Sequence, residues 1–395
     1  MEENKADGIK VPFFKASIGK EEEEAVLRVL HSGWLTTGKE ALAFEKEFAE
    51  KVGSPYALAV NSNTSGMVLA MEACGVKAGK AVITTPYTFV STAACARLLG
   101  ADVYFADIEE DSYSIDPASV ERILAGEKGK NVVAIVPVHI GGNLCNMEAL
   151  LAIAEKYKVR VIEDAAHSFP SPTRLGYAGT IGDAGVFSFY VTKTITTAEG
   201  GMVVTKDAEL AKRMASMRMH GMDRSTWDRY TSPRASWEYD IIAPGYKYNL
   251  PDILAALGRA QLAKADEFDR KRKEHVKTYN EAFKEMDFVK LPPTGEGNSW
   301  HLYLMRLDLT KLSCDRDTFA KELQARGVGI SVHFIPIFHF SYWHTFYKDF
   351  DAAHFPHAEQ HYRETISLPL WPDMDDGMVS YVIGCVKELG ETYHA

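Results

Sequence analysis

Short apolar runs rich in β-branched residues alternate with stretches of helical periodicity between about residues 57 and 205. Each apolar run is four to eight residues long, which is typical of a strand buried inside a sheet. We predict strands at Ala57–Asn61, Ala81–Thr84, Asp102–Ala106, Val132–His139, Val159–Glu163, Gly185–Tyr190 and Gly201–Thr205. The helical stretches between them include Ser65–Cys74, Val90–Leu99, Pro117–Leu124 and Met147–Tyr157. This alternation predicts an α/β fold, with a mostly parallel seven-stranded sheet sandwiched by helices.

The pattern changes after residue 250. A long helical stretch, Pro251–Met286, is followed by a polar break at residues 292–298. Beyond the break we predict strands at Leu302–Leu307 and Gly329–Phe334, and helices at Arg316–Ala325 and Gly377–Leu389. The chain therefore divides into a large domain, residues 1–250, and a smaller α+β domain, residues 251–395. An early helix at Lys20–Leu30 could pack with either.

Composition narrows the class of protein. The 395 residues are 46% apolar and 25% charged, which suits a globular protein with two cores. A net charge of −10 argues against nucleic acid as a partner. The five cysteines are scattered without a C-x-x-C pair, so we expect reduced thiols in a cytoplasmic protein. The chain has no run of about 18 apolar residues and no apolar signal core, so we expect no membrane association.

Reactive side chains follow two of the predicted strands. Asp164 ends one strand, and Ser188 and Lys193 stand at the end of the next. In an open α/β sheet, ligands bind at the carboxyl ends of the strands. A lysine can form a Schiff base with an aldehyde, and a carboxylate can keep a pyridine nitrogen protonated. Together these residues predict a site for pyridoxal 5'-phosphate (PLP).

Two other strand ends supply further groups. The segment Asn61–Gly66 turns from a strand into a helix, and its free backbone N–H groups and helix dipole could hold a phosphate. Phe89 follows another strand and could stack on a flat ring. The chain has no G-x-G-x-x-G after its first strand, which counts against a nicotinamide-dependent oxidoreductase.

With these residues the chain resembles the DegT/DnrJ/EryC1/StrS family of nucleotide-sugar aminotransferases, which have the fold-type I, aspartate aminotransferase-like fold. The matching segments occur in the family's order. They are His31–Gly38, Asn61–Met67, Pro86–Phe89, Pro137–His139, Glu163–His167, Phe187–Gly201, His220-Gly221, Tyr248-Asn249, Gln261-Leu262, His333–Pro336 and Ser367–Leu370.

The resemblance implies roles for the cofactor-binding residues. Lys193 takes the place of the Schiff-base lysine, and Asp164 that of the partner of the pyridine nitrogen. His167 stands next to the ring hydroxyl. Ser188 and the backbone at Asn63 and Thr64 match phosphate contacts.

It also implies roles at the rim of the site. Phe89 matches an aromatic residue stacked on the cofactor ring, and His333 matches a histidine that lines the sugar site. Asn249 matches an asparagine that reaches the phosphate from the other subunit, so we expect a homodimer with shared active sites.

The expected reaction is transfer of an amino group from an amino-acid donor, L-glutamate, to a nucleotide-linked keto-sugar. The segments Ser32–Gly38 and Asn63–Met67 are most like relatives that aminate C4. A PLP-dependent sugar dehydratase and a non-catalytic regulator on the same fold remain alternatives. Lys193 argues against the dehydratase, whose relatives carry His there.

Three departures from the family pattern stand out. Asn63 and Ala198 occupy positions where glycine is common, and Ile140 stands where an aromatic residue is common. Because Asn tolerates positive φ, we expect the turn at Asn63 to be preserved. The closely spaced His354, His357 and His361 are interrupted by Pro356, so we expect no metal site.

Overall fold

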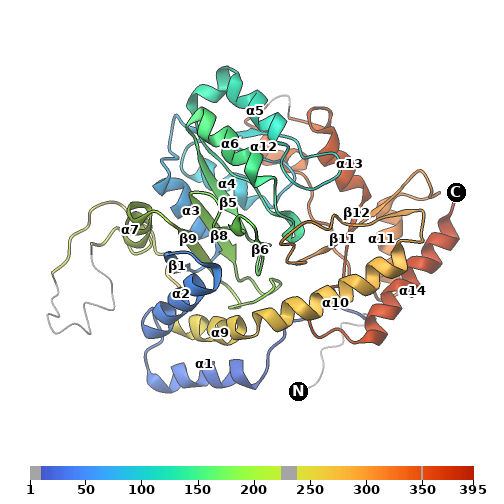
Figure 1. Cartoon of the computed structure of the whole chain (residues 1–395), viewed down its shortest axis with the longest axis horizontal. Coiled ribbons are helices and arrows are strands. Elements are labelled where there is room, and N and C mark those ends of the chain that lie inside the picture. The colour runs from blue at the N-terminus through green and yellow to red at the C-terminus, as the bar shows by residue number, and fades with distance from the viewer. Residues whose placement is uncertain (1–9, 224–237, 348–349) are drawn as a thin grey trace.

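A seven-stranded sheet lies at the centre of the larger part of the molecule (Figure 1). The computed structural model describes residues 10–223, 238–347 and 350–395. The strand order is β1-β9-β8-β5-β4-β2-β3, and β9 runs in the direction opposite to the other six strands. The bounds are β1 Tyr56–Val60, β2 Ala81–Thr84, β3 Asp102–Phe105, β4 Val132–Ile135, β5 Arg160–Asp164, β8 Ala184–Ser188 and β9 Gly201–Thr205. The mostly parallel α/β sheet is confirmed.

Helices cover both faces of this sheet, and the alternation of side chains along the strands explains why. Val186 of β8 packs into the core formed with α3, α4 and α7, whereas the next residue, Phe187, packs against α2 on the opposite face. Both faces are therefore buried, as continuous apolar strands require. The helices involved are α2 Lys39–Val52, α3 Asn63–Ala73, α4 Ser91–Leu98, α5 Pro117–Ala125, α6 Met147–Tyr157 and α7 Ala208–Met217.

The second part of the chain surrounds a small antiparallel sheet, β10-β11-β12. Its elements are β10 Val289–Lys290, β11 Tyr303–Leu307, β12 Thr365–Leu368, α11 Arg316–Ala325, α12 Ser341–His344, α13 Pro356–Glu364 and α14 Asp376–Tyr393. A minor hairpin, β6 Pro172–Thr173 and β7 Gly176–Tyr177, lies in the first part. The division at residue 250 stays a prediction. No helix in the part of the chain that the structure describes is both long and apolar enough to cross a lipid bilayer.

Two predicted elements differ from the structure. The long stretch from Pro251 to Met286 is two helices, α9 Asp252–Ala263 and α10 Ala265–Phe283, separated at Lys264 (Figure 1). The predicted strand Gly329–Phe334 is irregular and makes a single isolated bridge, between Ser331 and Ser367. The backbone of this segment also makes a hydrogen bond to a residue outside the sheet, since the Gly329 N–H donates to the Val11 carbonyl at 2.7 Å.

The start of α2 is held by a residue of α9. The buried Asp252 carboxylate accepts hydrogen bonds from the N–H groups of Gly38, Glu40 and Ala41, at 2.7 to 3.2 Å. This carboxylate satisfies the free donors of the first turn and lies at the positive end of the α2 dipole. A Cβ on Gly38 would lie 2.3 Å from Trp34 Nε1 and 2.9 Å from Asp252 Oδ2, so only glycine fits.

The backbone at Ala198 is strained. Its φ is +67°, in the left-handed region that glycine favours. Asn63, by contrast, lies in the first turn of α3 with ordinary helical geometry, so the positive φ considered for it is not needed. The departure from glycine therefore carries a conformational cost at Ala198 and not at Asn63.

We predict that Ala198→Gly raises the free energy of unfolding by about 0.5–1 kcal/mol, because relief of the left-handed strain exceeds the added chain entropy. Urea titration of the cofactor-free protein would measure this. Ala152→Gly, at an exposed position within α6, is the matched control and should destabilise by a similar amount. Equal destabilisation by both substitutions would contradict the strain.

Candidate active site

Asp164 ends β5 at the carboxyl edge of the large sheet and is almost fully buried. Its Oδ2 accepts a hydrogen bond from Thr92 Oγ1 at 2.7 Å. Its Oδ1 accepts from the Ala166 N–H at 3.2 Å and, at 3.4 Å, from Asn63 Nδ2. Burial raises the pKa of Asp164, while these bonds and the positive charge of Lys193 act in the opposite direction.

Glu163 and His139 fix the strand end that carries Asp164. The buried Glu163 carboxylate accepts from the N–H groups of Gly179, Ile181 and Gly182 at 2.6 to 2.7 Å. The Cys145 N–H donates to His139 Nδ1, so the ring proton is on Nε2, which donates to Glu163 Oε2 at 2.9 Å. These buried hydrogen bonds fix the position of the end of β5 that carries Asp164.

Lys193 lies in a loop that follows β8, the strand next to β5. The loop closes on itself, because Phe189 N–H donates to Gly200 O and Thr197 N–H donates to Phe189 O, both at 2.9 Å. Burial lowers the pKa of Lys193 to about 7, and the attraction of the Asp164 carboxylate offsets part of that lowering. Near neutral pH, a large share of this amine is therefore uncharged and nucleophilic.

The start of α3 offers free backbone donors. Ser62 caps the helix by accepting from the Ser65 N–H at 3.1 Å. Within the described part of the chain, the N–H groups of Asn63 and Thr64 have no acceptor. A Cβ on Gly201 would lie 2.8 Å from the Asn63 nitrogen, so β9 approaches this turn closely. Ser188 pairs with Gly201 in the sheet, which brings its hydroxyl to the same corner.

Histidines and an aromatic residue line another side of the site. The Gly141 N–H donates to His167 Nδ1 at 3.1 Å, which leaves the His167 proton on Nε2 as a donor. The His167 ring stacks on Phe334 with ring centroids 5.6 Å apart. His333 Nδ1 is 2.8 Å from Ser367 Oγ. Burial and the charge of Lys193 lower the pKa of His333 to about 3 and that of His167 well below its usual value.

Phe89 and Asn249 lie at the rim of this site. The Phe89 ring is 58% exposed, and its centroid is 6.1 Å from that of Phe334. Asn249 pairs with Val60, the last residue of β1, and its Nδ2 donates to Thr37 Oγ1 at 2.6 Å. In the single chain, therefore, Asn249 lies beside the turn into α3.

Sequence reasoning missed three groups in this site. Thr92 donates to Asp164, and its position one turn after Phe89 could have indicated it. The Gly141 N–H sets the His167 tautomer. His301 is buried with its ring centroid 4.4 Å from that of His167, and no local pattern marks it.

The whole chain matches known proteins of one kind. Residues 16–387 match the DegT/DnrJ/EryC1/StrS aminotransferase family. This chain belongs to that family. It is 40% identical over 385 residues to the spore coat polysaccharide biosynthesis protein SpsC of Bacillus subtilis, covering 96% of this chain and 97% of SpsC.

Solved structures agree with the family assignment. PseC of Helicobacter pylori, an aminotransferase involved in pseudoaminic acid biosynthesis, superposes with a TM-score of 0.88 at 30% identity, over 97% of this chain and 100% of that chain. The PLP form of Spr1654 from Streptococcus pneumoniae has a TM-score of 0.88 at 27% identity, over 97% and 99% of the two chains. This family member is thus a PLP-dependent sugar aminotransferase with the fold-type I architecture.

The residues at the carboxyl edge suit PLP. Among residues 10–223, 238–347 and 350–395, no basic side chain forms an ion pair with the buried Asp164 carboxylate, and a protonated pyridine nitrogen would provide that partner. The free N–H groups at the start of α3 suit a phosphate. Lys193 supplies a buried, largely neutral amine for an aldehyde.

We predict that Lys193 in the cofactor-free protein has an apparent pKa of about 7, because burial disfavours the charged form of its amine. Trace acetylation across pH, followed by peptide mass spectrometry, would measure it. Asp164→Asn removes the attraction that raises this pKa, so the midpoint should fall further. A midpoint of about 10.4, as for a solvated lysine, would contradict the burial.

Proposed function

We propose that this enzyme transfers an amino group from L-glutamate to the C4 keto carbon of a nucleotide-linked sugar. The observation that carries the proposal is the Lys193 amine, with its pKa lowered to about 7, at the same sheet edge as the buried Asp164 carboxylate with which it interacts. SpsC, which functions in polysaccharide biosynthesis, and PseC, which functions in pseudoaminic acid biosynthesis, support a sugar substrate. The choice of C4 rests on the likeness of Ser32–Gly38 and Asn63–Met67 to relatives that aminate C4.

When bound, PLP supplies an aldehyde that takes up the amino group and a ring that accepts the electron pair released at the donor's α-carbon. Lys193 would hold the cofactor through its aldehyde, and its free amine would take the proton from the donor's α-carbon. The same amine would supply a proton to the sugar carbon in the second half of the cycle. Asp164 would keep the pyridine nitrogen protonated.

Other side chains orient these groups. We assign the phosphate to Ser188 and to the N–H groups of Asn63 and Thr64, and the ring face to Phe89. His167 donates its Nε2 proton to the ring hydroxyl, a role that the Gly141 bond to Nδ1 supports. His333 lines the sugar site.

We further propose a homodimer in which Asn249 completes the site of the neighbouring subunit. Support comes from large apolar side chains that are exposed, namely Phe89 and Tyr190 at the site and Ile241 and Ile242 in the segment that leads to Asn249. A partner surface would cover such side chains. A cytoplasmic location is supported by the five free cysteines.

The decisive test is a product assay. Purified holoenzyme is incubated with L-glutamate and a panel of UDP-, GDP- and dTDP-linked 4-keto- and 3-keto-sugars, and the products are identified by mass spectrometry and NMR. We expect an amino group at C4 of one nucleotide sugar and stoichiometric 2-oxoglutarate. Exclusive amination of C3, or a dehydrated sugar without 2-oxoglutarate, would refute the assignment.

Asp164→Asn should lower kcat by several orders of magnitude while the cofactor remains bound, because the ring loses its proton and with it the capacity to accept electrons. Thr92→Val is the matched comparison, since it removes one hydrogen bond and leaves the carboxylate. We expect a much smaller loss for it. Near-normal turnover in Asp164→Asn would show that another group protonates the ring.

Shared sites predict complementation. Lys193→Ala and Asn249→Trp proteins should each be inactive, whereas mixed dimers should recover part of the activity, because one of their two sites combines two intact halves. Native mass spectrometry confirms that mixed dimers form. If they form without recovery, Asn249 serves its own chain's site, and light scattering that shows a monomer would exclude the dimer.

A further inference from the structure

Gln261, near the end of α9, makes three hydrogen bonds although it is buried. Its Oε1 accepts from the Thr196 N–H at 3.3 Å, three residues after Lys193. Its Nε2 donates to Ser17 O at 2.8 Å and to Glu22 Oε1 at 2.9 Å. A single side chain thus connects the Lys193 loop with α1 (Lys20–Ser32) and the residues just before it.

Glu22, the α1 residue that Gln261 contacts, is itself held by other groups. Glu22 is buried, and its second oxygen accepts from the Gly19 N–H and from Lys264 Nζ, both at 2.8 Å. Lys264 lies between α9 and α10. Gln261 therefore binds to a carboxylate that two other groups hold in place, and its own amide cannot rotate without breaking a bond.

The oxygen end of the Gln261 amide contacts the loop that carries Lys193. Thr196 Oγ1 donates to Phe189 O at 3.1 Å and accepts from the Ala198 N–H at 2.9 Å, so this threonine is bonded mainly within the loop. Its N–H is the group that reaches out to α9. Lys193 and Gln261 also line the same small cavity. A shift of Thr196 would consequently move the backbone that keeps Lys193 buried.

We propose that Gln261 is a positioning residue for Lys193: by holding Thr196 against α9 and α1, it fixes the backbone of the loop that carries Lys193 and so the position of the Lys193 amine. The proposal rests on the role of Lys193 in the proposed function. An amide is required, because one end must accept from a backbone N–H while the other donates to a carbonyl and a carboxylate. Glutamate lacks the donors, and methionine lacks both donors and acceptor.

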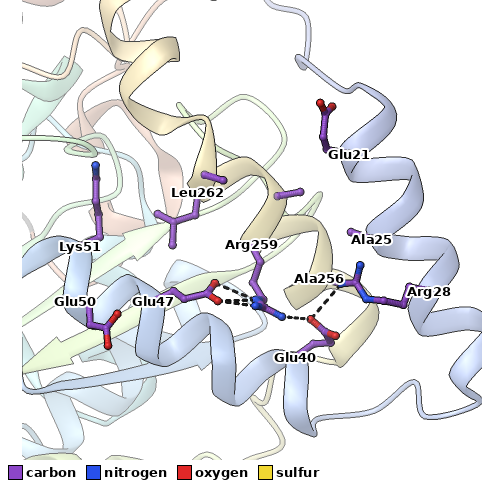
Figure 2. Close-up of a pocket in the computed structure, with 12 residues that line it drawn as sticks. Glu21, Ala25, Arg28, Glu40, Glu47, Glu50, Lys51, Ala256, Arg259 and Leu262 are labelled. Carbon is purple, nitrogen blue, oxygen red and sulfur yellow. Dashed lines mark hydrogen bonds and ion pairs between the residues drawn. The ribbon is translucent and has the colours of Figure 1, made fainter.

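A neighbouring residue on α9 provides a matched control. Arg259, two positions before Gln261, points to a different face of the helix and binds Glu47 and Glu40 of α2, as Figure 2 shows. Arg259→Met removes these ion pairs, which attach α9 to α2, but leaves every contact of Gln261. Loosening of α9 is thereby separated from loss of the bond to Thr196.

The experiment compares Gln261→Met, Gln261→Glu and Arg259→Met with the wild type. In cofactor-free protein, hydrogen exchange of amides 194–197 and the acetylation midpoint of Lys193 are measured; in holoenzyme, kcat and the KM for glutamate. For Gln261→Met we expect exchange at least tenfold faster, a Lys193 midpoint at least one pH unit higher, and kcat at least tenfold lower with KM within threefold. Arg259→Met should change none of these more than twofold.

A charge swap tests the chemistry of the bond. Gln261→Glu places a carboxylate against Glu22, whereas Gln261→Glu combined with Glu22→Gln restores a donor between the two side chains at unchanged net charge. We expect the double variant to regain most of the exchange protection that Gln261→Glu loses. If Gln261→Met does not fold, the comparison of Gln261→Glu with the double variant still tests the proposed role of Gln261.

Two outcomes would overturn the inference: a folded Gln261→Met with wild-type exchange and Lys193 midpoint, or a double variant no better protected than Gln261→Glu. The exchange and acetylation measurements need neither cofactor nor sugar. A failed product assay together with the predicted shifts would therefore reject the proposed function and leave the role of Gln261 intact.

Discussion

The burial of an amine and a carboxylate at one edge of a parallel sheet is the constraint on which the rest of this structure depends. β5 and β8 are adjacent and parallel, so Asp164 and the loop that carries Lys193 leave the sheet at the same end. Removing each group from water disfavours its charged form, which raises the pKa of Asp164 and lowers that of Lys193. Their mutual attraction offsets part of this cost without restoring ordinary ionisation.

The imidazole rings that face Lys193 add no further charge to the site. Three histidines, His167, His301 and His333, interact with Lys193, and burial lowers the pKa of each, so each is a neutral imidazole at physiological pH. A protonated ring there would repel Lys193 and a protonated pyridine nitrogen alike. Neutral rings can still donate or accept hydrogen bonds, and backbone contacts such as Gly141 N–H to His167 determine which nitrogen does so. These three rings thus provide polar contacts to the site without adding charge next to Lys193.

The features that could be predicted from the sequence are those set by residues close together in the chain. The seven strands of the large sheet were predictable to within a few residues, because burial on both faces produces the apolar runs themselves. The strand ends, and with them Asp164, Ser188 and Lys193, were predictable for the same reason. Helix α2 was not predicted, since its start depends on Asp252, more than 200 residues away. The roles of Thr92 and of the Asn63 amide were missed because they depend on where side chains meet in space, which no local period encodes.

Helix α9 shows why such distant contacts matter for chemistry. Its first residue, Asp252, caps α2 next to the Trp34–Gly38 turn, while Gln261 near its end holds the Lys193 loop. In between, Arg259 joins the helix to Glu40 and Glu47 (Figure 2). Glu22 accepts from both Gln261 and Lys264, the residue at which α9 gives way to α10. Since α10 packs through Val276, Tyr279 and Phe283 into the core around β11 and β12, a continuous series of contacts runs from that core through α9 to Thr196 in the Lys193 loop. Helix α9 is therefore the element that joins the packing around α10 to the loop that carries the reactive amine.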